Sequence, residues 1–145
     1  YQGDELWSFA LVDPDNRRPV DWDERDRLLG EVERAGGEEE RARLLAAAVA
    51  TPEDGRLKLM LTRALLHARR DHAGLFARGS WRAVPVQGMH ADRVVAAVRE
   101  HEGEAALVVA PRLTVGLGAE AAAPVGERWG DTALRLPDRL VRLEW

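Results

Sequence analysis

The chain has 145 residues, of which 46% are hydrophobic and 32% charged, a composition typical of one globular domain or two small ones. Its longest apolar run, LLAAAVA (44–50), is far shorter than the roughly 20 residues that span a bilayer, and no signal pattern leads the chain. The absence of cysteine excludes disulfides and thiolate ligands and favours a cytoplasmic location. A net charge of −4, with basic and acidic residues interleaved, argues against a nucleic-acid-binding face.

The first stretch, YQGDELWSFALVDPDNRRPVDWDE (1–24), is rich in Pro, Asp and Arg and predicts a loop. Its carboxylates could act as paired acids and bases, but in such a loop they more often form turns and pair with arginine. Trp7 and Trp22 flank the loop and are the better ligand candidates among the five tryptophans. The clustered carboxylates are Asp4, Glu5, Asp13, Asp15 and Asp21.

Between Asp23 and Ala73 the hydrophobic period is helical, and a Gly-Gly pair at 36 and 37 separates two short helices. A third helix is predicted to begin at Thr51-Pro52 and to end at Gly74. The apolar stripes of the three helices are Leu28, Leu29, Val32 and Ala35, then Leu44, Leu45, Ala48 and Val49, and finally Leu57, Met60, Leu61, Ala64, Leu65 and Ala68.

From Trp81 onward the apolar runs shorten to strand length and predict an antiparallel sheet against which the helical layer packs. The boundary lies in GLFARGSW (74–81), where the helical period stops. A hairpin is predicted around Gly103, and TALRL (132–136) alternates as a half-buried strand does. Trp81, Trp129 and Trp145 are expected to pack between sheet and helices. The six strand-length runs are WRAVPV, RVVAAV, EAALVVA, LTVGL, TALRL and RLVRLEW.

The sequence contains no recognisable catalytic or metal-binding motif. His67 and His72 are five residues apart and therefore lie on different helix faces, and no HExxH is present. His90 and His101 have no ligand spacing either. The chain also lacks GxSxG, GxxxxGK[ST] and GxGxxG, so we predict no metal and no cofactor.

The opening motifs resemble those of a known superfamily. YQGDELW resembles the segment that ends the eighth barrel strand of the α-amylase superfamily, and DPDNRRPVDWD resembles the loop that follows it. Together with KLMLTRALLHARRDHAGLF, ADRVVAAVRE and WGDTALRLP, these motifs make nearly the whole chain similar to the C-terminal part of the maltooligosyltrehalose synthase family.

This resemblance implies an α+β fold, in which a helical remnant of the end of a (β/α)8 barrel (1–78) precedes a small antiparallel β domain (79–145). The family converts the reducing-end α-1,4 bond of a maltooligosaccharide into an α,α-1,1 bond by a retaining route that needs two carboxyl groups roughly 5 Å apart. Its nucleophile, acid/base and supporting carboxylates follow barrel strands four, five and seven, upstream of this chain. A start at Tyr1 without Met is consistent with a fragment, which is expected to be inactive alone.

The same resemblance gives Asp15, Asn16 and Arg17 the role of shaping subsites for the maltooligosaccharide next to the cleaved bond, and Trp7 joins them as a ligand candidate. Alternatively, Arg17 only pins the loop. The expected partners are this substrate and the remainder of the catalytic barrel, with no nucleic acid and no membrane. An open stripe of Leu57, Leu61 and Leu65 would also favour a homodimer. A different interpretation of the chain is a non-catalytic carbohydrate-binding or interaction module that uses its β region.

Overall fold

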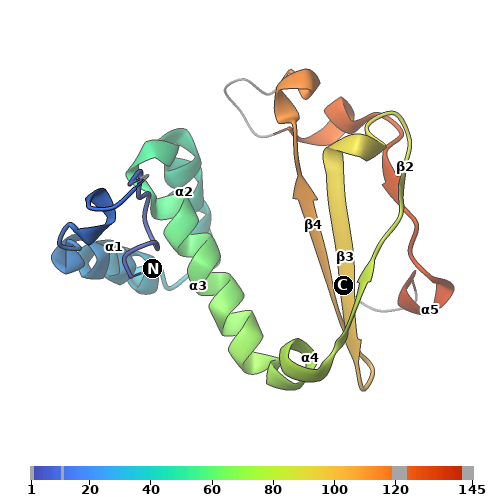
Figure 1. Cartoon of the computed structure of the whole chain (residues 1–145), viewed down its shortest axis with the longest axis horizontal. Helices are drawn as coiled ribbons and strands as arrows, with labels where there is room; N and C mark the ends of the chain where they lie inside the picture. Colours follow the sequence, from blue (N-terminus) through green and yellow to red (C-terminus); the bar gives the residue numbers. More distant parts are fainter. Residues whose placement is uncertain (1, 11, 119–123, 142–145) are drawn as a thin grey trace. The chain divides into compact units, whose positions relative to one another are not determined.

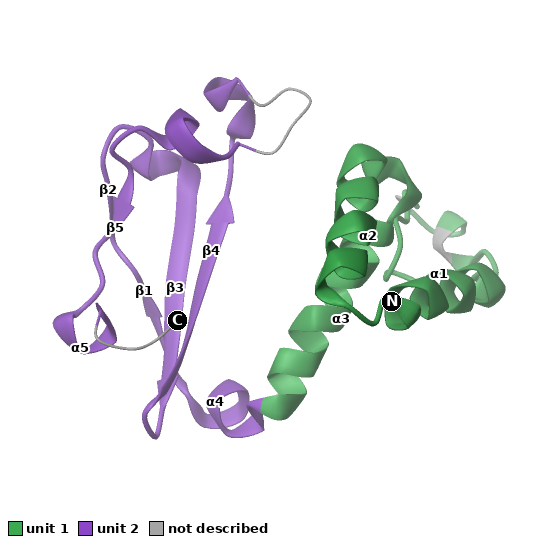
Figure 2. Cartoon of the chain, turned by 180° about the vertical axis from the view of Figure 1, so that it is seen from behind, with its two compact units in different colours: residues 1–71 green, residues 72–145 purple. Residues whose placement is uncertain are grey.

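The computed structural model describes residues 2–10, 12–118 and 124–141, which form a mixed α+β structure with five α-helices and two small antiparallel sheets. Two compact units divide the chain, Tyr1–Asp71 and His72–Trp145 (Figure 2). The first unit is helical, and the second holds the strands (Figure 1). Within the described residues, no helix combines the length and apolar character that crossing a membrane requires.

Helices α1 (Trp22–Arg34) and α2 (Glu38–Ala50) confirm the first two predicted helices and the glycine break between them. α1 begins where its sequence provides a cap, because the side chain of Asp21 accepts a hydrogen bond from the amide of Glu24 at 2.9 Å. The first turn of α2 carries three glutamates, whose negative charge is favourable at the positive end of the helix dipole.

Helix α3 (Arg56–Asp71) begins and ends at different residues from those predicted. Pro52–Asp54 forms a separate 3-10 helix, and Gly55 then takes a left-handed conformation with φ of 79°, which delays the start of α3. The predicted stop at Gly74 is wrong. His72 already departs from helical geometry, and Gly74 lies inside the next helix, α4 (Ala73–Arg78).

The core of the helical unit lies on a different face of α3 from the predicted apolar stripe. Leu59 is only 5% exposed and packs with the buried side chains of Leu6 and Leu28. Leu61 and Leu65 are each 59% exposed, so the predicted open stripe is present at these two positions, whereas Leu57 is half-buried. Dimerisation through this stripe and packing of the helical layer on the sheet stay predictions.

The second unit is built on a long antiparallel hairpin, visible as paired arrows in Figure 1. Its turn confirms the predicted hairpin, because Glu102 and Gly103 both have positive φ, of 48° and 89°, as tight hairpin turns require. The larger sheet has the strand order β1-β3-β4, and β2 pairs with β5 in the smaller one. The strands are β1 (Ser80–Ala83), β2 (Val86–Gln87), β3 (Val94–His101), β4 (Glu104–Pro111) and β5 (Ala133–Leu134).

One face of β3 supplies the core of this unit, where Ala96 and Val98 pack with Val84 and Leu140. TALRL shows the predicted alternation: Thr132, Leu134 and Leu136 are half-buried and the residues between them are exposed. Only Ala133–Leu134 of that run is paired as a strand.

Two predicted strands are wrong. LTVGL contains the 3-10 helix Thr114–Leu117, because the positive φ of Leu113, 51°, turns the chain out of the extended conformation. RLVRLEW begins as helix α5 (Asp138–Val141), which follows a proline suited to a helix start, and residues 142–145 lie outside the described residues.

The expected packing of the three C-terminal tryptophans between sheet and helices is wrong for Trp81. Trp81 is 59% exposed, so it does not pack between sheet and helices as predicted. Trp129 is half-buried, and its indole nitrogen donates a hydrogen bond to the carbonyl oxygen of Pro124 at 2.9 Å. Trp145 lies outside the described residues.

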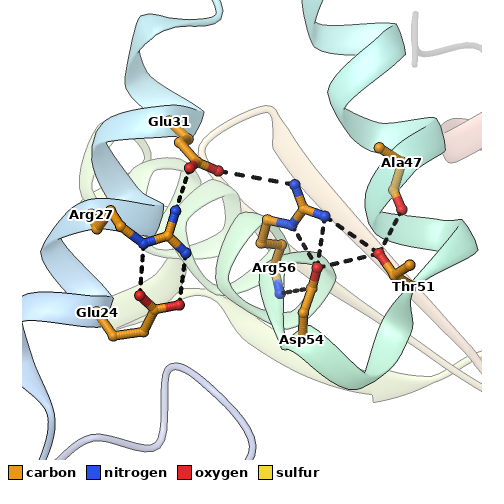
Figure 3. Close-up of polar contacts among 7 residues, drawn as sticks. All are labelled: Glu24, Arg27, Glu31, Ala47, Thr51, Asp54 and Arg56. Atoms are coloured by element: carbon orange, nitrogen blue, oxygen red, sulfur yellow. Dashed lines mark hydrogen bonds and ion pairs between the residues drawn. The ribbon is translucent and has the colours of Figure 1, made fainter.

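A polar network joins α1 to the start of α3 within the helical unit (Figure 3). Arg56 donates to the carboxylate of Asp54 at 2.7 Å and lies 3.9 Å from that of Glu31. Arg27 bridges Glu24 and Glu31 on α1 at 2.7 and 2.5 Å. The hydrogen bond from Arg56 lowers the pKa of Asp54, and that from Arg27 lowers the pKa of Glu24.

We expect the substitution Asp54→Asn to weaken the acid sensitivity of the helical unit. Because the folded pKa of Asp54 lies below its unfolded value of about 3.9, this carboxylate stabilises the fold above that value, and the stabilisation is lost as the pH falls through the folded pKa. The free energy of unfolding is measured at several pH values between about 2 and 7 by urea unfolding, followed by the circular dichroism of the helices. Glu53→Gln, at an exposed neighbour, is the matched control. If the free energy of unfolding of Asp54→Asn falls as steeply with decreasing pH as that of the parent chain, the role of the network is contradicted.

Candidate functional site

A hollow of about 390 Å³ opens in the N-terminal loop of the helical unit. The loop and the start of α1 form its wall, which combines aromatic, acidic and basic side chains. Such a mixture of a few polar groups with aromatic rings is typical of small-molecule sites. The side chains of interest among those lining it are Trp7, Phe9, Asp15, Arg18, Asp21 and Arg25.

Arg25 of α1 fastens the loop to the helix. Its guanidinium donates hydrogen bonds to the carbonyl oxygens of Gly3 and Asp21, at 2.5 and 2.8 Å. It also lies 3.7 Å from the carboxylate of Glu5. Only glycine suits position 3, because φ is 87° and a Cβ would lie 2.7 Å from the side chain of Val20. The wall of the hollow is therefore fixed at its base by one arginine.

Residues of α3 and of the turn before it hold Trp7, on the aromatic side of the hollow, in place. The indole nitrogen of Trp7 donates to the carbonyl oxygen of Pro52 at 2.7 Å. The ammonium of Lys58 lies 5.2 Å from the centre of the Trp7 ring and donates to the carbonyl oxygen of Leu6 at 2.9 Å. Phe9 stacks on Trp7 with ring centres 6.4 Å apart and planes inclined by 22°.

Asp13, Asp15 and Asp21 of the loop act as arginine partners or as a helix cap, which confirms that interpretation of the sequence for these three. Asp13 pairs with Arg17 at 2.5 Å, and Asp15 pairs with Arg18 at 2.6 Å. Asp21 caps α1, as described above. With these groups engaged by guanidinium or amide donors, the loop is suited to binding a polar ligand through its remaining lone pairs and N–H groups.

The structure brings together part of the predicted site. Trp7 and Asp15 both line the hollow. Arg17 and Asn16 belong to the same short 3-10 helix as Asp15, but the side chain of Arg17 is 74% exposed and turns to Asp13. The role of these four residues in binding a sugar stays a prediction.

Phe9, Arg18 and Arg25 line the hollow and were not identified as site residues from the sequence. The spacing Trp-x-Phe was a usable signal for Phe9, because in non-helical backbone, residues two apart face the same side. Arg25 follows Asp21 by four residues, the spacing at which a first-turn side chain reaches back to its cap.

His67 and His72 form ordinary polar contacts. Arg70 lies 3.4 Å from His67, and His72 contacts Glu104 at 3.0 Å. In the described part of the chain, no three His, Cys, Asp or Glu side chains are grouped so that they could hold a metal ion.

No protein-family model matches the chain. Two curated relatives, each a putative maltooligosyl trehalose synthase from Mycobacterium tuberculosis (strains CDC 1551 / Oshkosh and ATCC 25618 / H37Rv), are 38% identical over 117 residues. The match spans 81% of this chain but only 12% of each relative.

Two solved structures of maltooligosyltrehalose synthase from Arthrobacter ramosus are similar in fold as well. A mutant form of that enzyme has a TM-score of 0.68 and 31% identity, over 95% of this chain and 15% of its own. Another structure of the enzyme has a TM-score of 0.63 and 32% identity, over 92% of this chain and 15% of its own. The chain is therefore homologous to a small portion, 12 to 15% of the length, of maltooligosyltrehalose synthase.

Proposed function

We propose that the chain is the C-terminal part of a glucosylmutase that converts the reducing-end α-1,4 bond of maltooligosaccharides into an α,α-1,1 bond. The observation that carries this proposal is the likeness in fold and sequence to the Arthrobacter ramosus enzyme over 95% of the chain. In this proposal residues 1–78 are the end of the catalytic (β/α)8 barrel, and residues 79–145 are its small antiparallel β domain. The sequence motifs YQGDELW and DPDNRRPVDWD support it.

The N-terminal loop then contributes to sugar binding. Active sites of such barrels lie at the end where the βα loops gather, and the proposed position of this loop is after the eighth strand. We assign contacts with the maltooligosaccharide to Trp7, Asp15, Asn16 and Arg17. A guanidinium suits this task because its fixed fork can bridge a carboxylate and a sugar hydroxyl and it stays charged.

Cleavage of the glycosidic bond is assigned to the remainder of the barrel. A retaining reaction needs one carboxylate as nucleophile and one carboxylic acid as proton donor, roughly 5 Å apart. In the loop, Asp13 and Asp15 are each engaged by an arginine and Asp21 by a helix amide. These carboxylates therefore serve to orient the loop and its ligand, and the chain alone is expected to be inactive.

A chimera tests the proposal. In the Arthrobacter ramosus enzyme, the matching 15% of the chain is replaced by this sequence, and maltopentaose is supplied as substrate. We expect the folded chimera to consume reducing ends and to form maltooligosyltrehalose, whereas the 145-residue chain alone consumes none. A folded chimera without product, or reducing-end loss with the chain alone, would refute the proposal.

The second candidate is a carbohydrate-binding or interaction module centred on the β unit. One observation favours it: Trp81 is largely exposed on β1, with the Arg99 guanidinium 5.6 Å from its ring centre. Such a module would bind glucan through Trp81 in the absence of any barrel. Loss of glucan binding in Trp81→Ala, together with an inactive chimera, would favour this second candidate.

A further inference from the structure

We infer that Trp7 and Phe9 form an aromatic platform that stacks against one glucosyl ring of an α-1,4-glucan, with Phe9 as the outer ring. The choice of sugar rests on the proposed function. The platform itself rests on the geometry of the hollow, and it adds Phe9 to the residues that contact substrate.

The first argument is the exposure of the pair. Phe9 is 84% exposed although it stacks on Trp7, which is itself 45% exposed. A phenyl ring in this position forgoes most of the burial that a core would give it, while its close neighbour Leu6 is buried. Adjacent exposed aromatic rings beside a hollow are typical of a binding surface.

The second argument is that Trp7, the inner ring of the platform, is held in place. The Trp7 indole donates to Pro52, and Lys58 reaches both the Trp7 ring and the backbone oxygen of Leu6. These contacts come from a turn and a helix about 45 to 52 residues away along the chain. A ring fixed in this way loses little conformational entropy when a ligand stacks on it.

The third argument concerns the ligand. A pyranose ring has an apolar face of C–H groups and a rim of hydroxyls, so it needs an aromatic surface with hydrogen-bonding groups beside it. The hollow provides both, because the rings share it with the Asp15–Arg18 pair and with Arg25. An apolar peptide would bury these charged groups without new partners, at a cost. The volume of about 390 Å³ also falls in the range usual for small-ligand sites.

Nuclear magnetic resonance of the 145-residue chain, labelled with nitrogen-15, tests the platform. The five indole N–H signals are followed during a titration with maltopentaose, and Trp7→Phe identifies the signal of Trp7. We expect this signal to shift and saturate. Phe9→Ala should weaken the apparent affinity about tenfold, and Phe9→Tyr should stay within about twofold, since it keeps the stacking ring.

Two controls make the result specific. Met89→Ala, at an exposed apolar position of the β unit with no proposed role in binding, should leave the affinity unchanged, and cellopentaose should bind at least about tenfold more weakly, because its β-linked chain follows a different path. Melting temperatures of the Phe9 variants should match that of the parent, since Phe9 contributes little to the core.

An unshifted Trp7 signal, undiminished affinity in Phe9→Ala, or equal binding of cellopentaose would each overturn the platform. The proposed function is tested separately by the activity of the chimera. An active chimera without glucan stacking at Phe9 refutes the platform alone, whereas saturable stacking at Phe9 with a folded but inactive chimera refutes the proposed function alone.

Discussion

Replacing Leu59 by alanine is expected to lower the free energy of unfolding of the helical unit by about 2–5 kcal/mol. Leu59 is 5% exposed and shares a small core with Leu6 and Leu28. Its truncation removes the burial of several methyl and methylene groups and leaves a cavity that few neighbours can fill. Because this core has few members, one cavity removes a large fraction of the stability of the unit.

The matched control is Leu61→Ala, which makes the same chemical change two residues along the same helix. Leu61 is 59% exposed in the structure, so its truncation should change the free energy of unfolding by less than about 0.5 kcal/mol. Urea unfolding followed by circular dichroism measures both variants. If Leu61→Ala is as damaging as Leu59→Ala, the assignment of the buried face of α3 is wrong.

The contrast between these two leucines shows why periodicity predicted helix α3 but not its buried face. The sequence places Leu57, Leu61 and Leu65 at helical spacing, but further leucines at 59 and 66 occupy other faces of the same helix. Because Leu59 and Leu66 lie opposite that stripe, apolar residues occupy two faces, and the hydrophobic period indicates a helix without selecting the side that this unit buries. The face is selected by Leu6 of the N-terminal loop, which lies far away in sequence.

Local signals predicted the hairpin correctly because its turn and its apolar runs indicate the same structure. EAALVVA and the turn at Gly103 form the hairpin as expected, since both the apolar run and the positive-φ glycine point to the same structure. LTVGL has the composition of a strand, but Leu113 takes a positive φ, and a leucine in the sequence gives no sign of this conformation. RLVRLEW follows Pro137, which starts a helical turn instead of a strand.

The kinds of side chain in the candidate site could be predicted from the sequence, but which of them pair with one another could be predicted only in part. The sequence indicated that loop carboxylates would pair with arginines, and this is what Asp13 and Asp15 do. It could not indicate that Arg18 lines the hollow while Arg17 turns to Asp13. The two arginines are adjacent and chemically identical, and the direction of each side chain is set by the backbone conformation of one short 3-10 helix. Contacts from Lys58 and Pro52 to the loop depend on tertiary packing and have no local signal.

Under the proposed function, Arg17→Ala in the chimera is expected to raise hydrolysis relative to transglycosylation by about tenfold to a hundredfold. After the reducing-end glucose is released from the chain, it must turn and attack the glycosyl-enzyme with its anomeric hydroxyl before it leaves. If the guanidinium of Arg17 holds that glucose, its loss removes a charged hydrogen bond of about 1.5–3 kcal/mol, and water reacts in place of the sugar. Free glucose measured against maltooligosyltrehalose gives the ratio.

Asp13→Asn separates this role from a purely structural one. Asp13 is the ion-pair partner of Arg17, whose side chain is 74% exposed, and such exposed pairs contribute little to stability. If Arg17 only pins the loop, removing either member of the pair has the same consequence: a slightly lower melting temperature and an unchanged product ratio. If Arg17 holds the sugar, Asp13→Asn keeps the guanidinium and most of the transglycosylation, and only Arg17→Ala releases glucose. An unchanged ratio in Arg17→Ala would therefore refute the sugar-binding assignment, because the loss of the guanidinium itself would then have no effect on the fate of the glucose.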